Sequence, residues 1–370
     1  PLRPRARRFG AALFAGFAAR SLYHHAVINT THAMPPLVLT MGDPSGIGPE
    51  ITSKAWYALR EVGPRFVYLG DPSTLTCPMQ IVSEHQFTDV DFNAALPVLP
   101  VSISRAPVPG KPTPENATAI LASISGAVAL AKAELVSGIV TNPIAKAFLY
   151  GAGFGFPGHT EYLGALTKDW PDQTNMQRAA SGPIMMLAVP GLRVALVTIH
   201  LPLAVVPDAL TTEGIVHAGT VLNNALRRDF SIQAPRIALA GLNPHAGEGG
   251  TIGREEVDIV APAAEALRAS GIDIEGPLPA DSLFHGDARQ CYDAVLCLYH
   301  DQGLIPIKTI DFWGGVNITL GLPIVRTSPD HGTAFDIAGK GVARADSLIA
   351  ALQQANIIAR NRIKSAAWLS

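Results

Sequence analysis

The stretch VALVTIHLPL, Val194 to Leu203, joins a run of β-branched and aliphatic residues to a histidine, His200, at the point where the run stops. Two further stretches repeat this arrangement, because RIALAGLNPH ends at His245 and YDAVLCLYH ends at His300. Short apolar runs of this kind are typical of parallel strands that are covered on both faces. The sequence therefore predicts three buried strands, each followed by an imidazole.

Strand-like and helix-like segments alternate along most of the chain. The runs LVLTM, RFVYLG and ELVSGIVTN predict further strands, and TPENATAILASISGAVALAKA, ALTTEGIVHAGTVLNNALRRD and REEVDIVAPAAEALRAS predict helices, the last ending at Gly271. This alternation favours an α/β fold with a largely parallel sheet. Ligands of such sheets bind outside the carboxyl ends of the strands, which is where the three histidines are expected.

Composition excludes several classes of function. The chain has 370 residues, 48% hydrophobic and 16% charged, which suits a globular protein of two domains. Its formal net charge of −2 argues against a nucleic-acid binder. The 3 cysteines are too few for a disulfide framework, so a reducing compartment, the cytoplasm, is expected.

The first 34 residues differ from the rest, because they are rich in arginine and contain no Asp or Glu. They resemble a weak signal or transit peptide, but their apolar patch AALFAGFAA is too short to span a bilayer, so no membrane partner is expected. The chain opens on Pro1, and Met34 directly precedes the strand-like run PPLVLTM. We therefore expect a natural start at Met34, preceded by upstream sequence or a disordered tail.

The three histidines are candidates for metal ligands. They lie far apart in the sequence, which excludes the local HExxH pattern and suits ligands gathered from different strands. Three neutral imidazoles bind a divalent transition metal such as Zn, Co or Mn better than Mg, and leave a position open for substrate. A single histidine at a strand end is more often structural, so the prediction depends on all three.

Glycine-rich turns and isolated cations suggest that the ligand is an anion. Glycines follow His245 in NPHAGEGGTIGREE, where backbone amides can approach an anion at a helix N-terminus, although a flexible turn would be the preferred interpretation of this segment alone. A second glycine-rich turn is GDPSGIGPE, residues 42–50. Lys308, Asn317 and Arg326 stand in the apolar stretch IPIKTIDFWGGVNITLGLPIVRTS and suit a phosphate or carboxylate better than a solvated surface.

Several longer motifs carry a resemblance to a known family. TMGDPSGIGPE, VTNPIAK, FPGHTEYL, HLPL, GLNPHAGEGGTIG, YHDQGLIPIK and TSPDHGTAFDIAGKG, in order from about Met34 onward, resemble the 4-hydroxythreonine-4-phosphate dehydrogenase family of vitamin B6 synthesis. The resemblance implies two α/β/α domains around a cleft, as in isocitrate and isopropylmalate dehydrogenases. Residues 1–34 would be an extension, 35–165 with 310–370 the first domain, and 166–309 the second, carrying the metal histidines.

The resemblance also assigns site residues. It implies metal ligands at His200, His245 and His300, and substrate contacts at His159, Thr160, Lys308, Asn317 and Arg326. It gives the third histidine to the partner subunit, and so implies a homodimer with shared sites. Asp281 and Asp301 are candidates for the general base, with an orienting role toward an imidazole favoured for Asp301. Lys146 and Glu161 are further candidates, for each of which a structural salt bridge is the simpler interpretation.

The implied reaction is a metal-dependent oxidation of 4-phosphooxy-L-threonine at C3 by NAD or NADP. Decarboxylation to 3-amino-2-oxopropyl phosphate follows, with one divalent ion (Zn, Co, Mn or Mg) per site. An alternative substrate is threonate or erythronate 4-phosphate, which lacks the amine. A non-catalytic phosphate-binding protein would keep the cations without needing three histidines. The choice between NAD and NADP stays open, because no strand-end acid of the Rossmann type is found.

Overall fold

The computed structural model describes residues 34–156, 158–170 and 182–367. The chain divides into two units, Pro1–Ala33 and Met34–Ser370, and all of the described strands and helices belong to the second. The expectation about the segment before Met34 falls outside the described residues. Among the helices that are described, none is long and apolar enough to cross a membrane.

The described strands form one mixed sheet. They are β1 (Leu37–Thr40), β2 (Phe66–Gly70), β3 (Met79–Ile81), β4 (Leu96–Pro100), β5 (Gly138–Thr141), β6 (Ile184–Val189), β7 (Leu192–Leu196), β8 (Arg236–Ala240), β9 (Asp273–Leu278), β10 (Ala294–Cys297), β11 (Val316–Leu320) and β12 (Arg326–Pro329). Their order across the sheet is β3-β4-β2-β1-β5-β12-β11-β6-β7-β10-β8-β9. Most neighbouring pairs are parallel, but β11 pairs antiparallel with β12 and β6, and β6 pairs antiparallel with β7.

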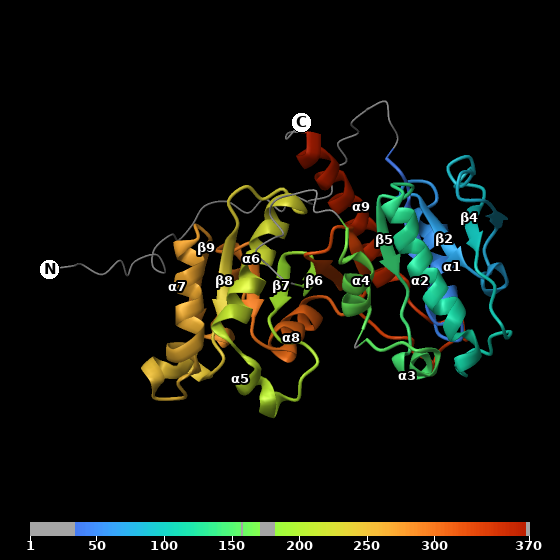
Figure 1. The fold of residues 1–370 in the computed structure, drawn as a ribbon. Helices are drawn as coiled ribbons and strands as arrows, with labels where there is room; N and C mark the ends of the chain where they lie inside the picture. Colours follow the sequence, from blue (N-terminus) through green and yellow to red (C-terminus); the bar gives the residue numbers. More distant parts are fainter. Residues whose placement is uncertain (1–33, 157, 171–181, 368–370) are drawn as a thin grey trace. The chain divides into compact units, whose positions relative to one another are not determined.

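Helices cover both faces of this sheet. They are α1 (Gly48–Leu59), α2 (Ala117–Lys132), α3 (Lys146–Leu149), α4 (His159–Thr167), α5 (Val206–Ala209), α6 (Thr212–Arg228), α7 (Ala261–Ala269), α8 (His300–Ile310) and α9 (Asp346–Ala367). Helix α2 packs on β2, β1 and β5, whereas α9 packs with α1 and contacts β5 and β12 from the other side (Figure 1). Further along the sheet, α6 and α8 both contact β7 and β10.

The sequence-based fold class is confirmed. The six predicted strands are β1, β2, β5, β7, β8 and β10, and two of the predicted helices are α2 and α6. The third begins with a π-helical turn, η6 (Glu256–Val260), before α7, and Gly271 follows its C-cap with a φ of +82°. The division into two domains stays a prediction.

The strand order brings the three histidine-bearing segments to the same end of the sheet, the carboxyl ends of three neighbouring strands. Strand β10 lies between β7 and β8 and is parallel to both, with Val295 opposite Val194 and Ala294 opposite Ile237. All three strands are almost completely buried, as their continuous apolar sequences require. The segments that carry His200, His245 and His300 therefore leave the sheet at the same end.

Candidate active site

His200 and His300 lie side by side in one chain. His200 follows β7, His300 is the first residue of α8, and their ring centroids are 5.8 Å apart. Burial lowers the pKa of His200 from its usual value, and the charges of Lys146 and His300 lower it further. Across the described residues, no group of three or more His, Cys, Asp or Glu side chains is close enough to hold a metal ion. The pair is thus formed within the chain, and His245 does not complete it there.

A carboxylate fixes the orientation of the second imidazole. Nδ1 of His300 lies 2.7 Å from Oδ1 of Asp301, whose side chain is otherwise exposed. This bond leaves Nε2 as the ring nitrogen that can bind a ligand. The contact is the one expected if Asp301 orients His300, the role that the sequence favoured for it.

A buried glutamine connects two of the histidine-bearing segments. Leu298 donates its backbone N–H to Oε1 of Gln302 at 2.8 Å, and Nε2 of Gln302 donates to the carbonyl of Gly241 at 2.7 Å. Gln302 therefore ties the junction of β10 and α8 to the end of β8. Sequence reasoning missed it, although it stands two residues after His300.

His245 stands on an unusual turn. The short helix η5 (Pro244–Gly250) contains six consecutive residues with positive φ, from His245 to Gly250. The backbone N–H groups of Leu242 and Asn243, just before it, both donate to the carboxylate of Glu256. The glycine-rich segment was predicted to hold an anion, and some of its neighbouring amides hold the chain's own carboxylate.

Arg326, at the start of β12, is a buried cation without a carboxylate partner among the described residues. It is 3% exposed, and its guanidinium donates to Oγ1 of Thr319 at 2.9 Å and to Oγ1 of Thr141 at 2.7 Å. Its Nε is buried and has no hydrogen-bond partner in the described part of the chain. Burial lowers the pKa of Arg326 to about 10, although the charge of Glu161 opposes the shift. A bound anion would provide both a negative charge and a hydrogen-bond acceptor for this guanidinium.

Two of the other predicted substrate contacts have unpaired polar atoms. Nε2 of His159, at the start of α4, and Oδ1 of Asn317, on β11, are buried and have no partner in the described structure. Burial, Arg326 and Lys146 together hold the pKa of His159 well below its usual value. Asn317 and Thr319 are two residues apart on β11, so their side chains point to the same face of the sheet. Asn317 therefore lies on the face where Thr319 contacts Arg326. Thr160 follows His159 in the first turn of α4.

Lys308 is already paired. Its Nζ lies 2.7 Å from Oδ2 of Asp330, whose side chain is 2% exposed, and 4.9 Å from the ring centroid of Phe312. Although this contact is an ion pair, Oδ2 of Asp330 has no well-directed hydrogen bond among the described residues. The two charges attract each other at this distance whatever the direction of the N–H bonds. Asp330 was not predicted from the sequence, although it stands in the motif TSPDHG beside Arg326.

The remaining candidates are Asp281, Lys146 and Glu161. Asp281 is exposed in η7 (Ala280–Ser282), which packs against η5. The salt bridges expected for Lys146 and Glu161 are not among the ion pairs within 4.0 Å that the described residues form. Both charges instead act on His200, whose pKa Lys146 lowers and Glu161 raises.

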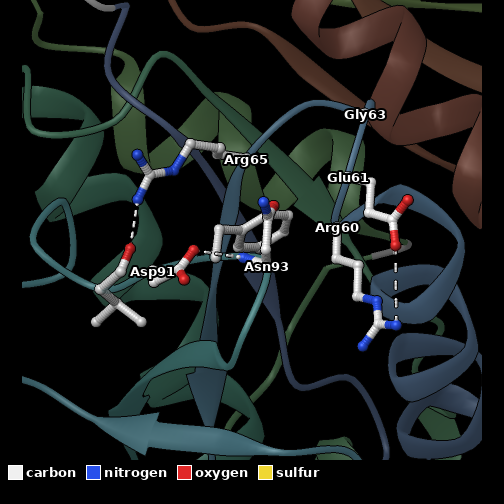
Figure 2. Close-up of a pocket in the computed structure, with 8 residues that line it drawn as sticks. Arg60, Glu61, Gly63, Arg65, Asp91 and Asn93 are labelled. Carbon is white, nitrogen blue, oxygen red and sulfur yellow. Dashed lines mark hydrogen bonds and ion pairs between the residues drawn. The ribbon is translucent and has the colours of Figure 1, made fainter.

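A separate hollow of about 370 Å³ lies near the amino end of β2 (Figure 2). It is lined in part by Arg60, Glu61, Arg65 and Asp91, between the end of α1 and the start of β2. Arg65 donates to the carbonyl of Val90 at 2.7 Å, so one of the two cations is engaged by the backbone. The hollow is at the amino end of β2, whereas the candidate site is at carboxyl ends.

The sequence of the chain is similar to those of known proteins. Residues 62–355 match the family model described as pyridoxal phosphate biosynthetic protein PdxA. The chain is 57% identical over 332 residues to the 4-hydroxythreonine-4-phosphate dehydrogenase of Caulobacter vibrioides, covering 88% of this chain and 98% of the relative.

Two solved structures are similar over most of the chain. The 4-hydroxythreonine-4-phosphate dehydrogenase of Klebsiella pneumoniae is 38% identical with a TM-score of 0.76, covering 88% of this chain and 99% of that one. A terephthalate 1,2-cis-dihydrodioldehydrogenase of Burkholderia xenovorans LB400 is 29% identical with a TM-score of 0.58, covering 87% of this chain and 98% of that one.

Proposed function

The chain belongs to the family of the pyridoxal phosphate biosynthetic protein PdxA, and from this premise we propose that it oxidises 4-phosphooxy-L-threonine at C3. The hydride passes to NAD or NADP, carbon dioxide is released, and 3-amino-2-oxopropyl phosphate is formed for vitamin B6 synthesis. The observation that carries the proposal is the buried guanidinium of Arg326, which has only two threonine hydroxyls as partners among the described residues and whose buried Nε–H is unpaired. A phosphorylated substrate supplies the missing anion.

The phosphate end of the substrate is bound by the residues around Arg326. The guanidinium donates to phosphate oxygens, and the neutral imidazole of His159 donates a further hydrogen bond through Nε2. Thr160 and Asn317 add a hydroxyl and an amide. Lys308 joins them only if the phosphate competes with Asp330 for its ammonium group.

The imidazole pair fits a divalent transition metal. Two rings with centroids 5.8 Å apart, one oriented through Nδ1 by a carboxylate, are a donor set that Zn, Co or Mn accepts and that Mg disfavours. The resemblance gave His300 to the partner subunit, but the closeness of His200 and His300 favours one chain for both. We therefore assign His245 of the partner subunit as the third ligand, in a homodimer with shared sites.

The chain's own groups handle the proton and the charge. A bound divalent metal would act as a Lewis acid that lowers the pKa of the C3 hydroxyl. Asp281 of the partner subunit accepts the hydroxyl proton, because it lies on η7 against the turn η5 that carries His245 and because Asp301 is engaged by His300. Hydride leaves C3 for the nicotinamide. The β-keto acid then loses carbon dioxide while the C–C electron pair passes to the ketone oxygen, and the resulting enolate takes up a proton at the carbon that carried the carboxylate, which gives the aminoketone phosphate.

The location of this chemistry is proposed to be the cytoplasm. Cys77, Cys291 and Cys297 are all free thiols, which supports a reducing compartment. A nicotinamide cofactor is consistent with the dehydrogenase names of the relatives.

A substrate panel tests the proposal. Reduction of NAD and NADP is followed with 4-phosphooxy-L-threonine, with threonate and erythronate 4-phosphates, and with a cis-dihydrodiol that lacks phosphate. We expect turnover, with release of carbon dioxide, on the amino acid phosphate. Activity confined to the amine-free phosphates would mean that the substrate is threonate or erythronate 4-phosphate. Activity confined to the dihydrodiol would refute the proposed phosphate pocket. Phosphate-ligand binding without any cofactor reduction would favour a non-catalytic binding protein.

A further inference from the structure

The turn that carries His245 has a backbone that needs external support. His245, Ala246 and Glu248 have φ values of 55°, 51° and 43°, and the glycines of the turn, residues 247, 249 and 250, have 73°, 68° and 94°. L-residues rarely adopt this left-handed conformation, and a run of several is less favourable still. Non-glycine residues persist there only when surrounding contacts fix them, which happens mostly at functional sites.

The support comes from one buried carboxylate. Oε1 of Glu256 accepts the backbone N–H of Leu242 at 2.8 Å and that of Asn243 at 2.6 Å, and Oε2 accepts Nδ2 of Asn243 at 2.9 Å. Glu256 is 3% exposed, and no cation pairs with it among the described residues. Its partners are therefore the N–H groups that immediately precede the strained turn.

The turn also wraps closely around this carboxylate. A Cβ on Gly247 would lie 2.6 Å from Oε2 of Glu256, so only glycine allows the approach. Glu256 opens the π-helical turn η6, which packs against η5. Short π-helical turns occur frequently at functional sites, where the extra residue in the turn changes the direction of a side chain.

From these contacts we propose that Glu256 is a positioning residue that holds the His245 imidazole in the orientation needed to bind the metal. The inference deepens the proposed function and rests on its metal site. Glu256 touches neither the metal nor the substrate. Its carboxylate sets the start of the left-handed turn, and the turn sets where His245 points.

The test is the variant Glu256→Gln, with Glu265→Gln on the exposed face of α7 as the matched control. Glutamine keeps an oxygen for the two backbone amides but turns an N–H₂ toward Nδ2 of Asn243. Metal-free full-length protein is titrated with Co²⁺ against a chelator, and amide hydrogen exchange is measured over residues 242–250. We expect Co²⁺ affinity to fall about 10- to 100-fold in Glu256→Gln. Exchange should rise in the turn alone, and the control should match wild type.

The outcomes separate this inference from the proposed function. If wild type binds no Co²⁺, the proposed metal site is wrong and the inference falls with it. If wild type binds Co²⁺ and Glu256→Gln binds it within twofold as tightly, Glu256 serves only the stability of the turn and the inference alone is wrong. If Glu256→Gln does not fold, Asn243→Ala removes one arm of the network, and its Co²⁺ affinity must then fall several-fold for the inference to stand.

Discussion

Replacing Arg326 by methionine separates the free-energy cost of burying the guanidinium charge from the role of that charge in binding phosphate. Burial lowers the pKa of Arg326 from 12.5 to about 10. At about 1.4 kcal/mol per pKa unit, the charged guanidinium is disfavoured by about 3 kcal/mol in the folded, ligand-free chain. Methionine removes this cost but also removes the bonds to Thr141 and Thr319, each worth about 1.5 kcal/mol or more. The two effects nearly cancel, so we expect stability to change by no more than about 1 kcal/mol.

The same substitution should abolish stabilisation by phosphate. For wild type, inorganic phosphate at about ten times its Kd stabilises the folded state by about 1.4 kcal/mol, because it binds only that state. Arg326→Met should lose this gain and raise the KM for the phosphorylated substrate, with its metal content unchanged. The assay is a pair of urea unfolding curves for each protein, with and without phosphate. Arg344→Met, which removes an exposed arginine paired with Asp346, is the control.

Two results would refute this reasoning. A loss of more than about 3 kcal/mol in Arg326→Met without ligand would mean that the guanidinium is a structural partner whose bonds outweigh its burial. Equal stabilisation of both proteins by phosphate would mean that the anion binds elsewhere.

Two further predictions concern other carboxylates. Burial alone would raise the pKa of Asp229, but Arg362 and Arg228 outweigh it and hold the pKa at about 2, below the usual 3.8. The lowered pKa stabilises the folded state by about 2 kcal/mol. This stabilisation is present above about pH 4 and is lost as the pH falls toward about 2. The free energy of unfolding in urea should fall less steeply across this range for Asp229→Asn than for wild type, and equal slopes would contradict the assignment. Asp301→Ala should weaken Co²⁺ binding about 10- to 100-fold, because His300 loses its orienting bond; unchanged affinity with a lower kcat would instead make Asp301 the general base.

The strands that position the histidines could be predicted because burial on both faces demands continuous apolar sequence. Strands β7, β8 and β10 meet this condition. Strand β12 does not, because its four residues RTSP are buried although three of them are polar. Their burial depends on pairing with β5 and β11, and hydrophobic periodicity carries no signal for it.

The sequence predicts the residue types of the candidate site but not which of these residues lie together. His200, His245 and His300 are candidates because each follows an apolar run, but only the structure shows which of them lie close together. The ion pair of Lys308 with Asp330 joins a helix to the end of a strand, and no local spacing predicts it. The left-handed turn was equally hidden, because Ala246 and Glu248 have no preference for positive φ.

The central claim is that each active site takes His200 and His300 from one chain and His245 from its partner. The measurement is the activity regained when pairs of inactive variants exchange subunits, with exchange confirmed by a tag. In a mixed dimer of His200→Ala with His245→Ala, one site collects three intact histidines. Random exchange makes about half of the dimers mixed, so about a quarter of wild-type activity should return. A mixture of His200→Ala with His300→Ala should regain none. Recovery in this second mixture alone would give His300 to the partner, and recovery in neither would place all three ligands in one chain.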